Sequence, residues 1–117
     1  MANIKKALAG ANAELRKIAL ADPQRIAFFD VEAWFVQRWG ERGPNGEPTY
    51  KTVTMGPNLH VANTAGDEPN NAVLNDGHAG MAANAMRAQS LVLRLREDFG
   101  LTLTPISDEE VAHFLAP

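Results

Sequence analysis

The chain has 117 residues, of which 45% are hydrophobic and 21% are charged, with a formal net charge of −3. This is the size of one ordinary domain, and the composition excludes a disordered tail. The absence of cysteine excludes a disulfide framework and a thiolate metal site. No apolar run approaches the roughly 18 residues that a membrane span needs, and the N-terminus does not have the pattern of a signal peptide. We therefore expect one intracellular domain with no membrane contact.

The charges are distributed unevenly along the chain. Residues 1–42 hold seven of the eleven Lys and Arg residues against five acids, a net charge of +2. Residues 43–117 hold the other four against nine acids, a net charge of −5. A weakly basic half and an acidic half suggest a bipolar assembly of several copies.

Residues 3–21 are predicted to form a first, basic helix. Apolar residues recur there with a spacing of four, three, four and three, which places them on one face. These residues are Ile4, Leu8, Ala11, Leu15 and Ile18. Four basic residues lie on two lines away from that face: Lys5, Arg16, Lys6 and Lys17. The exposed side of this helix is therefore basic, although an ordinary solvated face is the simpler alternative.

The Asp22-Pro23 pair predicts a second helix that runs from Pro23 to about Trp39, because Asp favours the N-cap and Pro the first helical position. Its apolar residues cover much more than one stripe, and one small core cannot easily bury all of them. We therefore expect part of this helix to form an oligomer interface, with burial in the chain's own core as the alternative. The expected interface residues are Phe28, Val31, Trp34, Phe35 and Trp39.

Residues 40–78 interleave glycines with prolines, which predicts a long and flexible middle segment. Residues 49–55 are rich in strand formers and could pair with residues 59–63 across a turn at residues 56–58, giving a small β-hairpin. We expect residues 63–77 to form an exposed, mobile loop.

Residues 79–99 are predicted to form the longest helix, which Gly100 ends. Its apolar residues again follow a heptad spacing: Met81, Ala85, Ala88, Val92, Leu95 and Phe99. This spacing predicts one apolar face over about five turns. Ser107 and Glu110 have the spacing of a capping box, which predicts a short C-terminal helix within residues 106–117.

The fold class that we expect is mainly α, with residues 1–117 forming a single helical oligomerising domain. Helices 23–39 and 79–99 are both long and amphipathic, and the segment between them is long enough to reverse direction. We therefore expect them to pack as an antiparallel helical hairpin, accompanied by the N-terminal helix over residues 1–21.

The sequence contains no pattern typical of a catalytic site, and we expect neither an enzyme nor a bound cofactor or metal. The weaker alternative is a metal-dependent enzyme that uses His60, Asp76 and His78, which are ligand types without the usual ligand spacing. The neighbouring carboxylates at residues 97–98 and 108–110 are more simply explained as solvated charge.

From Phe28 onward the layout resembles the P27-like family of phage terminase small subunits. The features that carry the resemblance are an aromatic-rich helix at residues 28–39, a glycine-containing middle at residues 40–77 and an amphipathic helix at residues 79–99. That helix is followed by Gly100-Leu101-Thr102 and, after two further residues, by Pro105.

The resemblance implies a non-enzymatic subunit that binds double-stranded viral DNA as a ring-shaped homo-oligomer. Such a subunit presents the DNA to the terminase large subunit, which carries the ATPase and the nuclease, in the cytoplasm of the host cell. If the chain is such a subunit, phosphate contacts need several basic side chains repeated around the ring. The expected DNA-binding residues are Lys5, Lys6, Arg16, Lys17 and Arg25, with Arg87, Arg94 and Arg96 as the next candidates. The alternative function is a small helical phage-type interaction or inhibitor protein without DNA binding.

Overall fold

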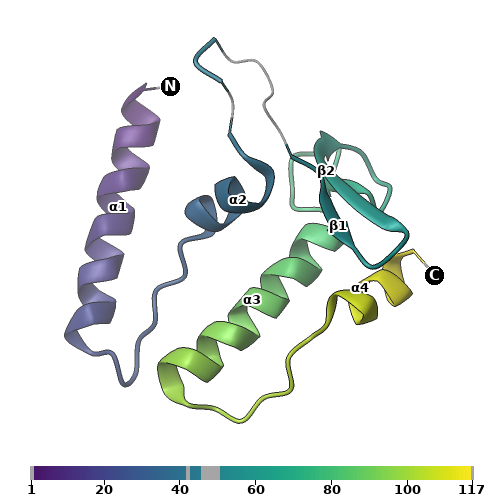
Figure 1. The fold of residues 1–117 in the computed structure, drawn as a ribbon. Helices are drawn as coiled ribbons and strands as arrows, with labels where there is room; N and C mark the ends of the chain where they lie inside the picture. The colour runs from purple at the N-terminus through teal and green to yellow at the C-terminus, as the bar shows by residue number, and fades with distance from the viewer. Residues whose placement is uncertain (1, 42, 46–50, 117) are drawn as a thin grey trace.

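The computed structural model describes residues 2–41, 43–45 and 51–116 (Figure 1). These residues form four helices and a three-stranded mixed sheet. In chain order the elements are α1 (Ala2–Ala21), α2 (Val31–Trp39), β1 (Val53–Met55), β2 (Leu59–Ala65), β3 (Asn71–Val73), α3 (Met81–Phe99) and α4 (Asp108–Leu115). Helices make up 51% of the structure, and the sheet makes the fold α+β. Our prediction of a mainly α fold is therefore right about the helical majority and incomplete about the sheet.

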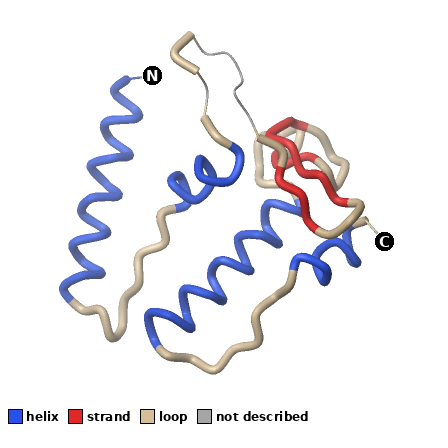
Figure 2. The backbone as a smooth tube through the Cα atoms, in the orientation of Figure 1, coloured by secondary structure: helices blue, strands red, loops and turns tan. Residues whose placement is uncertain are grey.

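The molecule is thin and extended for its length. Its principal extents are 42 × 42 × 21 Å and its radius of gyration is 15.9 Å, against about 13 Å for a compact domain of this size. Figure 2 shows the arrangement: α1 stands along one edge, α4 and the sheet occupy the other, and α3 lies between them. A shape of this kind leaves much of each helix exposed to solvent.

The predicted first helix is confirmed, and α1 begins one residue earlier than expected. Of its 20 residues only Ala19 is buried. The apolar face that the sequence predicts is therefore present on the helix, but the rest of the described chain does not cover it.

The second helix is much shorter than predicted, because residues 23–30 are not helical. The carbonyl oxygen of Asp22 accepts hydrogen bonds from the backbone N–H groups of Arg25 at 3.1 Å and Ile26 at 2.9 Å, which closes one isolated turn. The chain then runs without regular structure to Asp30. The prediction that Pro23 opens a long helix is therefore wrong.

Asp30 is the residue that caps α2. Its side chain accepts a hydrogen bond from the N–H of Ala33 at 2.9 Å, and Glu32 places a negative charge in the first turn, where the helix dipole favours it. Starting the helix here leaves the preceding segment free to bring the ring of Phe29 to 6.1 Å from that of Trp34. Asp22 and Asp30 are the same residue type and equally good N-caps. The packing of the preceding segment therefore determines that Asp30 caps the helix.

The predicted hairpin is confirmed over its described part, because β1 and β2 pair antiparallel with Val53 opposite Val61 and Met55 opposite Leu59. Residues 49 and 50 of the predicted first strand lie outside the described residues. Gly56 turns the chain with a φ of +59°, a conformation that L side chains rarely adopt.

A third strand lies where we predict a mobile loop. The strand β3 pairs parallel with β2, and its Ala72 is fully buried. The N–H of Ala62 donates to the carbonyl of Asn70, and the N–H of Gly66 donates to that of Val73, both at 2.9 Å. Residues 63–77 therefore include parts of two strands and the buried Ala72, so the prediction of a loop is wrong for these parts.

The long helix α3 is confirmed, and Gly100 ends it in the left-handed conformation with a φ of 64°. The prediction of its buried face is wrong, however. The buried residues are Ala82, Ala83, Met86, Gln89 and Ser90, whereas the predicted heptad face is exposed or half-buried along its length. The helix is rotated because Gln89 and Ser90 have specific partners inside the molecule, which apolar periodicity does not indicate.

The short C-terminal helix is confirmed together with its capping box. The Ser107 hydroxyl accepts a hydrogen bond from the N–H of Glu110 at 3.1 Å, and the Glu110 carboxylate accepts one from the N–H of Ser107 at 2.7 Å. The amide of Gln89 holds this helix start against α3 by donating to the carboxylate of Asp108 at 2.9 Å.

The predicted hairpin of two long helices is replaced by a different packing. The helix α3 packs chiefly against α4 and β3, and α4 also packs against β1. The much shorter α2 meets α3 at Trp34, whose indole nitrogen donates to the hydroxyl of Ser90 at 2.7 Å. The core is completed by Trp39, which is fully buried and donates to the carbonyl of Val61 at 3.0 Å.

Candidate functional site

The basic residues predicted to contact DNA have unequal freedom in the structure. Arg16 pairs with Asp30 at 3.1 Å and Lys17 with Glu14 at 2.6 Å, and the Nε of Arg25 donates to Asp22 at 2.6 Å. For Lys5 and Lys6 the described residues provide no ion pair, and both side chains are exposed. The two lysines in the first turns of α1 are therefore the most available of the five.

Arg16 also has a structural role. Its guanidinium lies 4.8 Å from the centre of the Phe28 ring, and its ion pair with Asp30 connects α1 to the N-terminal end of α2. Exposed pairs of this kind contribute little free energy singly. Their geometry nevertheless positions α1 against the segment that precedes α2.

The three arginines of the second predicted basic cluster, on α3, have different partners. Arg94 pairs with Asp98 at 2.7 Å, and Arg96 donates to the carbonyl of Leu103 at 2.6 Å. Arg87 has no ion pair among the described residues, and its guanidinium lies 6.0 Å from the centre of the Trp34 ring. Of the three, Arg94 alone has an acidic partner in the described chain, Arg96 is held by a backbone carbonyl, and Arg87 has neither contact among the described residues.

Arg38 is a basic residue that sequence reasoning does not single out. Its guanidinium lies 5.3 Å from the centre of the Trp34 ring and donates to the hydroxyl of Ser90 at 3.2 Å. The structure thus brings Arg38 and Arg87, from two different helices, to the same indole ring. Two half-buried guanidinium groups without a described carboxylate partner form a local positive site, since each can still donate hydrogen bonds to an anion.

Of this pair, Arg38 lines a groove between α2 and α3. The groove has a volume of about 790 Å³, and it contains aromatic and apolar side chains together with Arg38, Arg94 and Arg16. Its acidic members are Asp30 and Glu97. Arg16 and Arg94 are already paired, so one further cation, Arg38, and one further carboxylate, Glu97, remain in the groove.

The residues predicted to form an oligomer interface differ in how far they are exposed. Trp34 is 7% exposed and Trp39 is 0% exposed, so neither is available to another subunit in this conformation. Phe28 and Phe35 are half-buried, and only Val31 is exposed. The chain's own core buries both tryptophans, because the sheet and α3 supply the surface, and it leaves Phe28, Phe29 and Phe35 half-buried.

The uncovered apolar surface lies on α1 instead. Ile4, Leu8, Leu15 and Ile18 form a stripe that we call the α1 seam, and they are between 49% and 64% exposed. The helix faces the rest of the molecule with a different side, because Ala9, Asn12, Ala13 and Arg16 line the hollow between α1 and α2. An exposed stripe with coiled-coil spacing is typical of a helix that binds a partner.

A second apolar surface lies on the other side of the molecule, between α3 and α4. This hollow has a volume of about 330 Å³ and contains one acidic residue, Glu110, among apolar ones. We call it the α3–α4 groove, and its apolar residues are Ala85, Ala88, Ile106, Val111, Phe114 and Leu115. Phe114 is 81% exposed, so its ring is a large apolar surface in water.

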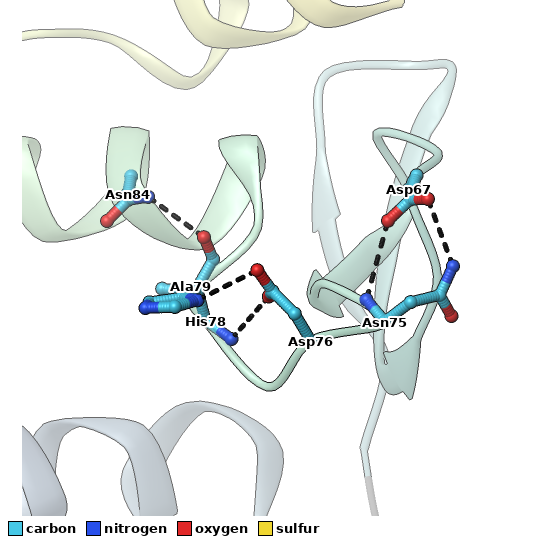
Figure 3. Close-up of polar contacts among 6 residues, drawn as sticks. All are labelled: Asp67, Asn75, Asp76, His78, Ala79 and Asn84. Carbon is cyan, nitrogen blue, oxygen red and sulfur yellow. Dashed lines mark hydrogen bonds and ion pairs between the residues drawn. The ribbon is translucent and has the colours of Figure 1, made fainter.

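The histidines do not form the metal site that we consider as the alternative. Asp76 and His78 lie in one loop, with 3.0 Å between the carboxylate and Nδ1 (Figure 3), whereas the ring of His60 lies beside Thr54 on the sheet. Across the described residues, no group of three or more His, Asp and Glu side chains is placed to hold a metal ion.

The loop that contains this pair is held by side chains that bond to the backbone. The carboxylate of Asp76 accepts a hydrogen bond from the N–H of His78 at 3.0 Å, and that of Asp67 accepts one from the side-chain amide of Asn75 at 3.0 Å (Figure 3). Hydrogen bonds from the backbone and ring of His78 lower the pKa of Asp76 below its usual 3.8. Both residues are well exposed, so the pair closes a turn rather than activating a nucleophile.

Neither a membrane-spanning helix in the described residues nor a match to known proteins helps to assign the site. Within the described ranges, none of the helices combines the length and apolar character needed to cross a bilayer. No protein family, curated protein or solved structure matches the chain.

Proposed function

We propose that this chain is a non-enzymatic DNA-recognition subunit that works as a homo-oligomer. The function is the one implied by the resemblance to phage terminase small subunits. In this role the chain binds double-stranded viral DNA as a ring and presents it to the large ATPase and nuclease subunit in the host cytoplasm. The observation that supports the proposal best is α1, a helix with an uncovered apolar seam and, outside the seam, two exposed lysines that form no ion pair with the described residues.

The seam supports the assembly part of the proposal. Four large apolar side chains at heptad spacing on one helix are an excess of exposed apolar surface for so small a chain. Covering them requires a protein surface, and a second copy is the partner always present. Repetition of the subunit also multiplies its basic residues, which a single chain with net charge −3 needs in order to attract DNA.

The DNA part of the proposal rests on four of the cations that have no acidic partner among the described residues. Lys5 and Lys6 lie on α1, while Arg38 and Arg87 lie beside Trp34. Lysines on a mobile exposed face provide phosphate contacts without base recognition, and arginines can hold a phosphate with two parallel hydrogen bonds. We therefore move the expected DNA contact from the paired Arg16, Lys17 and Arg25 to these four residues.

The test is a mobility shift with a double-stranded oligonucleotide at two salt concentrations. The K5Q/K6Q double variant should bind at least about tenfold more weakly, and its affinity should fall less steeply with salt because fewer counterions are released. K17Q is the matched control, since Lys17 lies on the same helix but pairs with Glu14. Equal affinity of wild type and both variants would remove α1 from the DNA site, and no binding by the wild type would reject the proposal.

A second function, a helical interaction or inhibitor protein without DNA binding, is favoured by one observation. Arg16, Lys17 and Arg25 are each neutralised by an acidic neighbour in the chain. In that case the exposed seam of α1 binds a different protein, and the basic residues serve solubility. An assembled wild-type protein that is indifferent to DNA at low salt would favour this second function.

A further inference from the structure

The described chain has two uncovered apolar surfaces of complementary shape. The α1 seam presents four projecting Leu and Ile side chains. The α3–α4 groove presents a hollow of about 330 Å³ with Ala85 and Ala88 on its α3 side and Phe114 at α4. Small residues on one helix let the large side chains of another approach closely, as in the packing of knobs into holes.

We propose that the α1 seam of one copy docks in the α3–α4 groove of the next copy, so that subunits join head to tail. This inference rests on the assembly part of the proposed function and names the two surfaces that carry it. The contact cannot form within one chain in this conformation, because α1 and α4 lie at opposite edges of the molecule with α3 between them (Figure 1).

Charge complementarity identifies a second copy as the occupant. Lys5 is turned about 100° around the helix from Ile4 and lies one turn before Leu8, so it flanks the seam on the side of the helix that carries Arg16. Glu110 lies in the groove, in the first turn of α4, where Asp108 and Glu109 add two further negative charges. A basic residue at the edge of the seam therefore meets an acidic group at the edge of the groove when the two surfaces join.

The whole chain shows the same polarity. Residues 1–42 carry a net charge of +2 and residues 43–117 a net charge of −5. Docking of the first helix of one copy on the last helices of another brings these halves together, whereas a pairing of seam with seam places two like-charged helices side by side. Electrostatics therefore favour the contact between unlike surfaces.

The geometry of such a contact determines the type of assembly. Each copy uses its seam once and its groove once, so the contact is heterologous, and repeated contacts close into a ring or continue as a filament. Contact of a seam with a second seam would instead give a twofold dimer and leave every groove empty. The two arrangements predict particles of different mass when a variant with a disrupted seam is mixed with a variant with a disrupted groove.

The experiment uses two variants of the full chain and light scattering after size-exclusion chromatography, without DNA. The seam variant is L8E/L15E and the groove variant is A88E/F114S, all four at exposed or half-buried positions. Tryptophan fluorescence of the buried Trp39 shows that each variant is folded. Each variant alone should be monomeric, and an equal mixture should form a particle of two chains, because the seam variant supplies an intact groove and the groove variant an intact seam.

Three results would overturn the inference. A groove variant that assembles like the wild type means that seams pair with each other, and a seam variant that still assembles means that the seam is not used. A wild type that stays monomeric at high concentration rejects assembly itself. Formation of the two-chain particle by a protein that does not bind DNA would support the contact while rejecting DNA recognition.

A charge variant tests the direction of docking. K5E should raise the dissociation constant of the assembly by about tenfold, because it places a negative charge against Glu110. K17E is the matched control, since Lys17 lies on the far side of α1 from the seam and pairs with Glu14. Equal effects of the two substitutions would contradict this direction.

Discussion

The indole nitrogen of Trp34 donates a hydrogen bond of 2.7 Å to the hydroxyl of Ser90, 56 residues later in the chain. The same hydroxyl donates to the carbonyl of Met86 at 3.1 Å and accepts from Arg38 at 3.2 Å. One small side chain thus joins α2 to α3 and fixes how α3 is rotated. The groove between these helices and the position of Arg38 beside Trp34 depend on this connection.

The first prediction concerns this bond. S90A should lower the free energy of unfolding by about 1–3 kcal/mol, because it leaves the buried Trp34 N–H without an acceptor. W34F/S90A should be less destabilised than the sum of the single variants, since it removes the donor and the acceptor together. Urea unfolding at one protein concentration measures all three, and a loss below about 0.5 kcal/mol for S90A would show that the bond is unimportant.

The second prediction separates the core from an interface. W39A should destabilise the fold by about 3–5 kcal/mol, because Trp39 is fully buried and fills the centre of the core. V31S should change it by less than about 0.5 kcal/mol, since Val31 is exposed on the first turn of the same helix. A W39A protein that keeps its stability and loses only its assembly would contradict the burial of this residue.

The third prediction compares two glycines. G80A should destabilise the chain by about 1–3 kcal/mol, because a methyl group there collides with the backbone carbonyl of Asn71. G10A should stabilise α1 itself by about 0.5–1 kcal/mol, since Gly10 lies within this helix with nothing near its added methyl group. Thermal unfolding of both variants checks the opposite signs, and equal shifts would contradict the close approach at Gly80.

The fourth prediction concerns pH. The pKa of Asp76 is lowered mainly by the hydrogen bond from the backbone N–H of His78. A carboxylate with a lowered pKa stabilises its turn above the ordinary pKa of Asp, and this contribution is lost as the pH falls through the lowered value. Order in the turn should therefore decrease as the pH falls below 3.8 towards the lowered pKa.

The measurement is a carboxyl titration by NMR. H78A should raise the pKa of Asp76 towards 3.8 without reaching it, because the backbone bond remains when the ring is removed. H113A is the control, since His113 lies on α4 and should leave Asp76 unchanged. An unchanged pKa in H78A would show that the ring does not act on the carboxylate.

The elements with strong local signals could be predicted from the sequence. The heptad spacing of α1, the glycine that ends α3 and the capping box of Ser107 and Glu110 all act within a few residues, so their signals survive in any tertiary context. The β1–β2 hairpin also carries its turn between its strands. In each case the residues that form the structure are neighbours in the sequence.

The parts that could not be predicted depend on distant partners. The strand β3 pairs in parallel with β2. It has only three residues, which is too few to show a periodic pattern in the sequence. The choice of Asp30 over Asp22 as a cap and the burial of both tryptophans depend on the surface that α3 and the sheet provide. The site residues Arg38 and Arg87 come together only because both reach Trp34.

The near absence of buried residues in α1 divides the chain into two units that unfold separately. Most helical stability in proteins comes from the packing of an apolar face, and α1 contributes only Ala19 to the interior. Its amide hydrogens should exchange with solvent through detachment of the helix, while those of Val61 and Met86 exchange only when the core opens globally. Native-state hydrogen exchange of a dilute sample would therefore show two protection levels within one small domain, with the boundary at the turn after Ala21.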